Sequence, residues 1–147
     1  MVRQTATAAG LPHPAGPYSH VAGVGGLHFA SGQAGADGEG RLASGIADQS
    51  RQCFANLLAA VGAAGATEKD VVKVAVYLTD VADFAAMNEA YESAFTAPYP
   101  ARTTVYVTLP PGMLIEADVV AVTAAKEHAE RIGSRASRSS PESRPRR

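Results

Sequence analysis

Few residues of this chain could do chemistry, and Arg102 is the most informative of them. It follows the segment 98–101, Pro-Tyr-Pro-Ala, and begins a run of alternating apolar and polar side chains that predicts a half-buried strand over residues 102–109. The two prolines restrict the backbone and fix where that strand begins. A guanidinium at the strand entrance is permanently charged, and its planar fork matches a carboxylate. If Arg102 faces a cleft, we expect it to hold a substrate that carries an acid group.

Two further polar side chains, Asn88 and Glu116, occur within predicted apolar elements. Asn88 lies in the apolar stripe of a predicted helix, where a buried amide without partners costs about 1–3 kcal/mol. It therefore either ties the helix to a loop, which the pattern alone favours, or lines a pocket. Glu116 lies between two apolar residues of a predicted strand, where a solvated carboxylate is the ordinary interpretation. In a closed cleft, it could instead orient or deprotonate a water molecule.

Tyr18 and Ser31 bracket the first predicted hairpin, and each alone is an ordinary hydroxyl used in packing or turns. Together at an interface, they could line a pocket that also presents the backbone amides of Gly32 and Gln33. Metal and cofactor chemistry is unsupported, because the four histidines and the single cysteine show no metal-ligand spacing. The chain also contains no phosphate loop, dinucleotide fingerprint or nucleophile elbow.

The length and composition predict one domain with a single core. The chain has 147 residues, of which 46% are hydrophobic, and no apolar run approaches the roughly 20 residues that cross a bilayer. The first residues do not resemble a secretory signal. The lone Cys53 excludes an internal disulfide, agrees with a reducing cytoplasm, and falls on the apolar side of a predicted helix, where packing is its favoured role.

The charge is distributed unevenly along the chain. Residues 131–147 contain six arginines and one glutamate, a net charge of +5, and are rich in serine and proline. We expect this segment to be a disordered, solvated tail following a domain over residues 1–130. The domain itself has seven Lys and Arg against thirteen Asp and Glu, a net charge of −6, which argues against nucleic acid as its main partner.

The order of predicted elements indicates an α+β sandwich in which two helices cover one face of a sheet. Strands are expected near residues 4–7, 18–24, 27–31, 70–79, 102–109 and 114–124, and helices near residues 44–64 and 81–95. Gly25-Gly26 predicts a tight hairpin, Asp80 is the candidate N-cap of the second helix, and Gly65 ends the first.

Apolar periodicity predicts which sides of these elements are buried. The two helices have stripes formed by Ile46, Cys53, Phe54, Leu57, Leu58 and Val61, and by Phe84, Met87, Tyr91 and Phe95. One face of the strand at 70–79 is formed by Val72, Val74, Val76 and Leu78. The opposite sheet face is partly apolar, which favours self-association next to Arg102. Its expected members are Ala75, Tyr77, Tyr106, Val120 and Val122, together with Lys73, Thr104 and Thr108.

Several separated motifs occur in the order found in one family, and over roughly residues 8–125 the chain resembles the RidA (YjgF/YER057c) family of enamine/imine deaminases. The matching segments are 16–20 (Gly-Pro-Tyr-Ser-His), 31–33 (Ser-Gly-Gln), 49–57, 64–65, 70–73, 83–84, 87–91 (Met-Asn-Glu-Ala-Tyr), 100–102 (Pro-Ala-Arg), 109–110 and Glu116.

The resemblance implies a chorismate-mutase-like fold and a homotrimer with active sites between subunits. It implies cofactor-free hydrolysis of reactive 2-enamino and 2-imino acids, such as 2-aminoacrylate, 2-iminopropanoate and 2-iminobutanoate, to a 2-oxo acid and ammonium. In this family the equivalent of Arg102 binds the substrate carboxylate, and the glutamate at Glu116 positions the attacking water. The counterparts of Tyr18, Ser31 and Asn88 line the pocket. Independently of the resemblance, we expect backbone amides near Ser31, such as that of Gly32, or near Arg102 to complete the grip on the substrate carboxylate.

Alternatives to this activity stay open. The same fold could be a non-catalytic small-molecule-binding or interaction module, or a pathway-specific enzyme that acts on a different imine. The acidic domain does not favour the ribonuclease or translation-inhibitor roles proposed for similar proteins. The strand after Arg102 is one residue shorter than in archetypal members, and such a change reverses side-chain facing unless a bulge or loop absorbs it.

Overall fold

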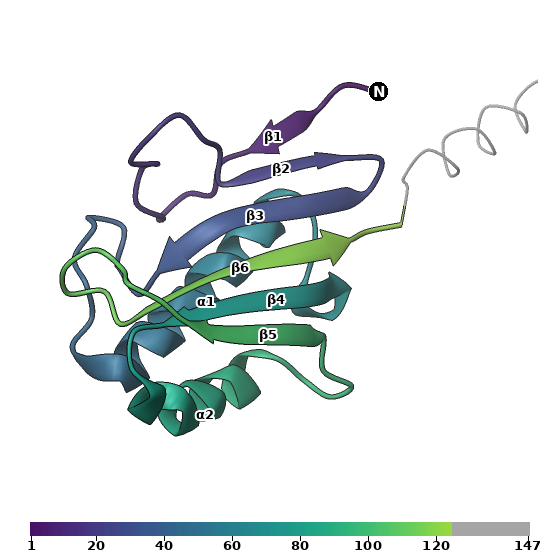
Figure 1. The fold of residues 1–147 in the computed structure, drawn as a ribbon. Coiled ribbons are helices and arrows are strands. Elements are labelled where there is room, and N and C mark those ends of the chain that lie inside the picture. The colour runs from purple at the N-terminus through teal and green to yellow at the C-terminus, as the bar shows by residue number, and fades with distance from the viewer. Residues whose placement is uncertain (125–147) are drawn as a thin grey trace, which may run out of the picture.

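The computed structural model describes residues 1–124, which form one mixed six-stranded sheet with two helices on one face (Figure 1). The strand order is β1-β2-β3-β6-β4-β5; only β4 and β5 pair in parallel. The strands are β1 (Gln4–Ala6), β2 (Val21–Val24), β3 (Leu27–Ala34), β4 (Val71–Leu78), β5 (Ala101–Tyr106) and β6 (Ile115–Val122). The helices are α1 (Gly45–Ala63) and α2 (Phe84–Ala94), with 3₁₀ turns η1 (Glu68–Asp70) and η2 (Val81–Asp83). The predicted α+β class is confirmed; the expected tail lies outside the described residues.

The β2–β3 hairpin turns at Gly25-Gly26, as predicted. Both glycines have positive φ, 58° and 87°, which the tight hairpin turn requires and other residues rarely adopt. β2 begins three residues later than expected, and β3 continues to Ala34 instead of ending at Ser31. Its pairing with β6 shifts register between Ala30 and Gln33, so an irregularity carries the strand past the expected end.

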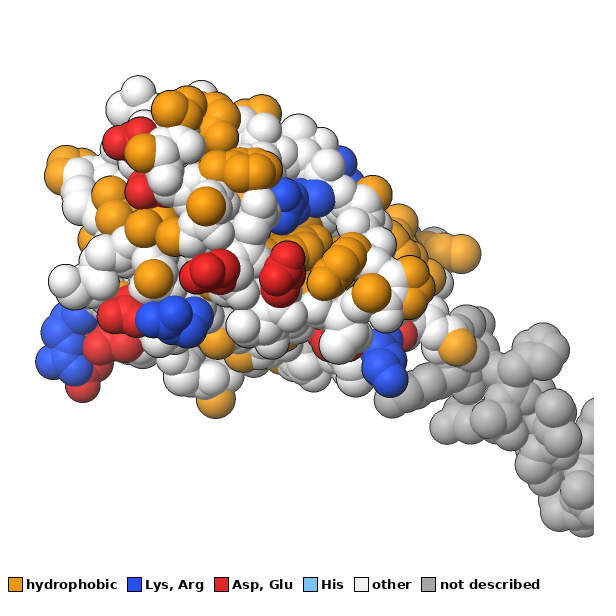
Figure 2. Space-filling view, turned by 90° about the horizontal axis from the view of Figure 1, so that it is seen from below, with side chains coloured by type: hydrophobic (Ala, Val, Ile, Leu, Met, Phe, Trp, Pro, Cys, Tyr) orange, Lys and Arg blue, Asp and Glu red, His pale blue; other side chains and the backbone are white. Residues whose placement is uncertain are grey.

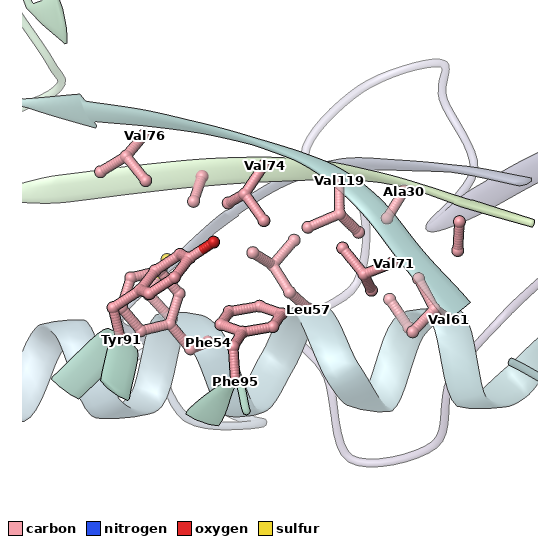
Figure 3. Close-up of a cluster of buried hydrophobic side chains, with 14 of the residues drawn as sticks. Ala30, Phe54, Leu57, Val61, Val71, Val74, Val76, Tyr91, Phe95 and Val119 are labelled. Atoms are coloured by element: carbon pink, nitrogen blue, oxygen red, sulfur yellow. The ribbon is translucent and has the colours of Figure 1, made fainter. Parts of the chain in front are cut away.

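The core lies between the sheet and the two helices. Phe54 of α1 packs edge-on against Tyr91 of α2, with ring centroids 5.5 Å apart, and both meet Phe95 beneath the valines of the sheet (Figure 3). The predicted stripe of α1 is confirmed, with Ile46 and Leu58 at its partly buried margin. The stripe of α2 is buried except at its first member, Phe84, which remains 40% exposed.

Helix α1 carries a glycine that its fold does not need. Gly62 is exposed in the last turn, and a Cβ built there meets no atom within 4 Å. We expect Gly62→Ala to raise the free energy of unfolding by about 0.5–1 kcal/mol, because alanine loses less backbone entropy on folding. Urea denaturation measures this. Gly65→Ala is the matched control, expected to destabilise by about 1 kcal/mol because its φ is +84°. Destabilisation by Gly62→Ala would show that the fold does require glycine at position 62.

Two buried polar side chains of α1 fix the loops next to the candidate site. Gln49 Nε2 donates to the carbonyls of Ala43 and Gly112 at 3.1 and 2.9 Å, and its Oε1 accepts from Leu114 N at 2.9 Å. Asn56 Nδ2 donates to the carbonyls of Ala34 and Ala36 (3.0 and 2.8 Å). The start of β6 and the end of β3 are therefore anchored to one rigid helix.

The predicted facing of β4 is wrong at its first residues. Val72 was expected on the buried face but is 48% exposed, whereas Val71 is buried. The pairing of β4 with β6 shifts between Val71 and Lys73. This bulge adds one residue, which reverses the facing of the side chains before it. After the bulge, Val74, Val76 and Leu78 are buried as predicted.

The predicted facing of β5 is also wrong. Register pairs Thr104 with Val76 and Tyr106 with Leu78, so both lie on the helix-covered face and not on the open face. Thr103 and Val105 occupy the open face instead. The facing of an edge strand follows its pairing with the neighbouring strand, which alternation within β5 alone does not reveal. Thr108 falls after the end of β5.

The open face is partly apolar, as predicted, although its members differ. Lys73 Nζ donates to Thr103 Oγ1 at 2.7 Å, and the Tyr77 hydroxyl donates to Asp118 Oδ2 at 2.9 Å. Around these polar pairs lie apolar side chains that are each at least one-third exposed: Leu27, Phe29, Val105 and Val122. One protomer therefore leaves this face uncovered.

Candidate active site

Arg102 lies at the start of β5 and points to the helix-covered side of the sheet, in register with buried Val74. Its Cζ atom lies 4.7 Å from the centre of the Tyr91 ring and 5.7 Å from that of Phe84. Its Nη1 atom lies 3.9 Å from Met87 Sδ. The guanidinium therefore rests on a bed of aromatic rings and sulfur supplied by α2.

No carboxylate neutralises Arg102 within residues 1–124. The ion pairs there are formed by Arg41 and Arg51, both on the exposed surface. A half-buried guanidinium is always charged, and without an internal counter-ion it can accept an external carboxylate in a bidentate pair. The geometry thus agrees with the anion-binding role expected of this residue.

A cavity of about 450 Å³ opens beside Arg102, lined by Asn88, Tyr91, Glu92, Tyr99, Pro100 and Arg102 itself. The Asn88 amide makes no hydrogen bond with any residue of the described part, so the interpretation of Asn88 as a structural tie is not supported. Burial raises the pKa of Tyr91, and the positive charge of Arg102 only partly opposes this effect. Figure 2 views the side on which α2 lies and shows hydrophobic side chains next to separate basic and acidic groups.

A second cavity contains the other predicted site residues. Tyr18, Gly32 and Glu116 line it, between the segment before β2 and the β5–β6 connection. Burial raises the pKa of Glu116 above its usual 4.5, and the negative charge of Asp118 raises it further. No described residue donates a hydrogen bond to the Glu116 carboxylate, which leaves both oxygens free to bind water or substrate.

Gly32 makes room for the Glu116 side chain. A Cβ built on Gly32 would lie 2.6 Å from Glu116 Oε1, closer than carbon and oxygen can approach. We expect Gly32→Ala to displace the carboxylate and, if Glu116 has its expected role in imine hydrolysis, to lower the kcat/KM of that reaction at least about tenfold, because misplacing a catalytic group slows a reaction steeply. Folding should hardly change, because a flexible side chain can move aside. Enzyme assay and thermal unfolding measure the two effects, with Gly62→Ala as control; parental activity would contradict the prediction.

The two predicted hydroxyls differ in availability. Tyr18 is 48% exposed, and its hydroxyl accepts a hydrogen bond from Ala15 N at 3.0 Å. The Ser31 hydroxyl donates to the Ser19 carbonyl at 2.6 Å and does not line the cavity that Gly32 lines. Ser31 therefore fixes the chain around β2 and β3, while Tyr18 keeps its proton available as a donor.

The structure does not bring all predicted site residues together in one protomer. Arg102 and Asn88 share one cavity, whereas Tyr18, Gly32 and Glu116 share another. Glu116 pairs with Tyr77 of β4 and alternates with buried neighbours, so it lies on the open face of the sheet, opposite Arg102. In a single protomer, the predicted site residues are therefore divided between two separate cavities.

Sequence reasoning missed the second role of the α2 stripe. Met87 and Tyr91 were interpreted as core residues only, yet both also contact the Arg102 side chain. Their spacing on the helix that precedes the arginine strand was the available signal. Cys53 is buried, donates to the Gln33 carbonyl at 3.1 Å, and has its pKa raised by burial, which confirms a packing role.

Within residues 1–124, no group of three or more His, Cys, Asp or Glu side chains could hold a metal ion. None of the helices there is long and apolar enough to cross a bilayer.

Comparison with known proteins identifies the class to which this fold belongs. A family model described as Endoribonuclease L-PSP matches residues 9–123. The chain is 44% identical over 113 residues to a RutC family protein of Pyrococcus abyssi, covering 75% of this chain and 89% of the relative. It is 37% identical over 125 residues to the 2-iminobutanoate/2-iminopropanoate deaminase of Homo sapiens, covering 83% and 91%.

The solved structures agree. RidA from an Antarctic Psychrobacter bacterium superimposes with a TM-score of 0.78 at 39% identity, covering 82% of this chain and 99% of that one. The mixed sheet with two helices on one face is the fold of these proteins. The chain belongs to the RidA (YjgF/YER057c) family.

Proposed function

We propose that this protein hydrolyses reactive 2-enamino and 2-imino acids, such as 2-aminoacrylate and 2-iminobutanoate, to 2-oxo acids and ammonium. The observation that carries the proposal is the half-buried Arg102 guanidinium, which no carboxylate of residues 1–124 neutralises and which shares a cavity with Asn88. Relatives named as imine deaminases support it.

The chemistry needs only water and well-placed side chains. Arg102 binds the substrate carboxylate, and the Glu116 carboxylate orients a water molecule toward the imine carbon. A 2-enamino acid first becomes the imine by moving a proton from its nitrogen to C3. The water oxygen forms a bond to the carbon of the protonated imine as the C=N π bond breaks, one water proton passes to Glu116, and the nitrogen becomes an amine. Glu116 returns that proton to the nitrogen, the C–N bond breaks as the hydroxyl oxygen forms the C=O bond, and the hydroxyl proton passes to the departing ammonia, which gives ammonium and the 2-oxo acid. Positioning of this kind supplies much of the rate increase, because the substrate is already reactive.

The two cavities could act on one substrate only if a second protomer brought them together. We propose that the active site forms where the Arg102 cavity of one protomer meets the Glu116 cavity of its neighbour, in a homotrimer. The uncovered apolar face supports such assembly, since Val122 is exposed on β6, the strand that carries Glu116, and Leu27 and Phe29 are exposed on the neighbouring β3. Closed symmetric assembly repeats the same contact in every protomer, so each interface would complete one site.

The setting of this activity is also a proposal. We propose a cytoplasmic enzyme without a cofactor or metal, which removes damaging metabolites and does not act on nucleic acid. The acidic charge of the domain supports the last point, because it would repel phosphate backbones.

A second candidate is a module that binds 2-oxo acids without turnover, or a pathway-specific enzyme for a different imine. The separation of Arg102 from Glu116 within one protomer favours the binding module. A ligand held by Arg102 of that protomer would have no water molecule positioned by Glu116 beside it. Relatives named only as RutC family proteins leave room for other substrates.

The test couples the purified protein to a serine or threonine dehydratase and follows semicarbazone formation from the released imine. Faster 2-oxo acid release with less semicarbazone supports the deaminase. Binding of pyruvate without faster release supports the binding module. If the protein neither speeds 2-oxo acid release nor binds pyruvate, both the deaminase and the binding module are wrong.

A further inference from the structure

We propose that the rings of Tyr91 and Phe84, with Tyr91 first, are positioning residues that hold the Arg102 guanidinium in the orientation that binds the substrate carboxylate. This inference rests on the proposed function, because it concerns the same site. The Arg102 Cζ atom lies 4.7 Å from the Tyr91 ring centre, within the range at which a cation is attracted to an aromatic face. The Phe84 ring lies 5.7 Å away and forms a second wall.

The Tyr91 ring is a rigid platform. Tyr91 is only 4% exposed, and its ring contacts Phe54 at 5.5 Å and Phe95 at 4.6 Å between centroids. These rings belong to the core between the helices and the sheet (Figure 3). A platform fixed on both sides can limit the rotamers of a long arginine side chain, which lowers the freedom lost when a ligand binds.

The side chains of Phe84, Met87 and Tyr91 orient the Arg102 guanidinium without neutralising its charge. Among residues 1–124, the guanidinium contacts the two rings and Met87 Sδ at 3.9 Å, none of which carries a charge. The Glu92 side chain lines the same cavity but forms no ion pair with Arg102. A carboxylate in this place would hold the side chain more firmly, but it would also compete with the substrate acid. An aromatic and thioether bed fixes the direction of the charge and leaves that charge available.

The ring of Tyr91 carries this role, and its hydroxyl does not. The Tyr91 hydroxyl oxygen is buried and has no hydrogen-bond partner among residues 1–124. It therefore neither anchors the guanidinium nor relays a proton to a described group. This predicts that phenylalanine can replace Tyr91 and that an aliphatic residue cannot.

The experiment compares Tyr91→Phe, Tyr91→Leu and Phe84→Leu with the parent, measuring kcat and KM for the imine and the Kd for pyruvate. Tyr91→Leu should raise KM and Kd by about tenfold while kcat stays within about twofold, because substrate is held less well. Tyr91→Phe should behave as the parent. Phe84→Leu should raise KM and Kd by about two- to threefold, because the Phe84 ring is farther from the charge.

The outcomes separate the possible failures. Loss of kcat at unchanged KM in Tyr91→Leu would mean that Tyr91 merely supports the fold, and would overturn the inference alone. Equal losses in Tyr91→Phe and Tyr91→Leu would assign the role to the hydroxyl, also overturning it. If Tyr91→Leu does not fold, Phe84→Leu decides, because Phe84 is partly exposed and its replacement should not disturb folding. An unchanged Kd for pyruvate in Phe84→Leu would then show that the rings do not position Arg102. A parent that neither hydrolyses the imine nor binds pyruvate would overturn the proposed function as well.

Discussion

Replacing Arg102 by alanine is expected to lower kcat/KM for imine hydrolysis by about 100-fold or more, because it removes the guanidinium that we propose binds the substrate carboxylate. A hydrogen bond to a charged group contributes roughly 1.5–3 kcal/mol, and a bidentate pair exceeds a single bond. The protein should remain folded and assembled, since Arg102 makes no ion pair with any residue in the range 1–124. Steady-state kinetics with the coupled dehydratase and analytical ultracentrifugation measure the two effects.

Arg102→Lys is the matched control for this result. Lysine keeps the positive charge but not the planar fork, so it should recover part of the lost binding and remain clearly below the parent. An Arg102→Ala variant that clears the imine at the parental rate would show that the carboxylate is bound elsewhere. Full activity in Arg102→Lys together with loss in Arg102→Ala would mean that charge alone suffices.

The second large effect is expected from Glu116→Gln. The amide keeps the shape of the side chain but cannot accept a proton from water, so kcat should fall by about 100-fold or more. Because Arg102, and not Glu116, is proposed to bind the substrate carboxylate, KM should change little. A variant that keeps the parental kcat would exclude Glu116 from the proton transfer.

The raised pKa of Glu116 gives this assignment a pH signature. Activity requires the ionised carboxylate, so the rate should rise with pH through a value above the usual 4.5. Asp118→Asn removes one of the two causes of that raised pKa and should move the acid limb to lower pH. An acid limb unaffected by Asp118→Asn would show that another group controls it.

The same shift predicts how stability depends on pH. A carboxyl whose folded pKa is raised favours its neutral form, so its stabilising contribution is present below the unfolded pKa and lost as pH rises through the folded pKa. Glu116→Gln, which stays neutral, should therefore have a higher Tm than the parent at pH 7, and this difference should vanish below about pH 4. Parallel thermal melts at both pH values check it.

The helices and the first hairpin could be predicted because their signals are local. The stripe around Phe54 and Leu57 follows the 3.6-residue period, and Gly25-Gly26 can adopt the positive φ that the turn needs. These features do not depend on how the strands pair in the sheet. The predicted ends of α1 accordingly differ by one residue from the observed ends.

The facing of the sheet residues could not be predicted in the same way. Thr104 and Tyr106 were assigned to the wrong face because β5 takes its facing from parallel pairing with β4, whose partner residues lie 28 positions earlier in the chain. The bulge at Val71–Lys73 reversed Val72 for a related reason. Side-chain alternation specifies two faces but does not say which one a neighbouring strand will cover.

The residue types of the site came from the sequence, whereas their separation came from the structure. Arg102 and Glu116 were predicted to act on one substrate, yet the fold places them on opposite faces of one sheet. No local pattern shows this, because it depends on the register of three strands. We therefore propose that neighbouring protomers bring these two side chains together.

Mixing two inactive variants tests whether one site takes residues from two protomers. Arg102→Ala and Glu116→Gln proteins are unfolded together at equal amounts, refolded and assayed. If each site takes its arginine from one protomer and its glutamate from the next, random assembly of a cyclic oligomer restores about one quarter of the sites, and about one quarter of the parental activity returns. If activity stays at the level of the separate variants although mixed oligomers have formed, both residues must act from the same protomer, and the account is wrong.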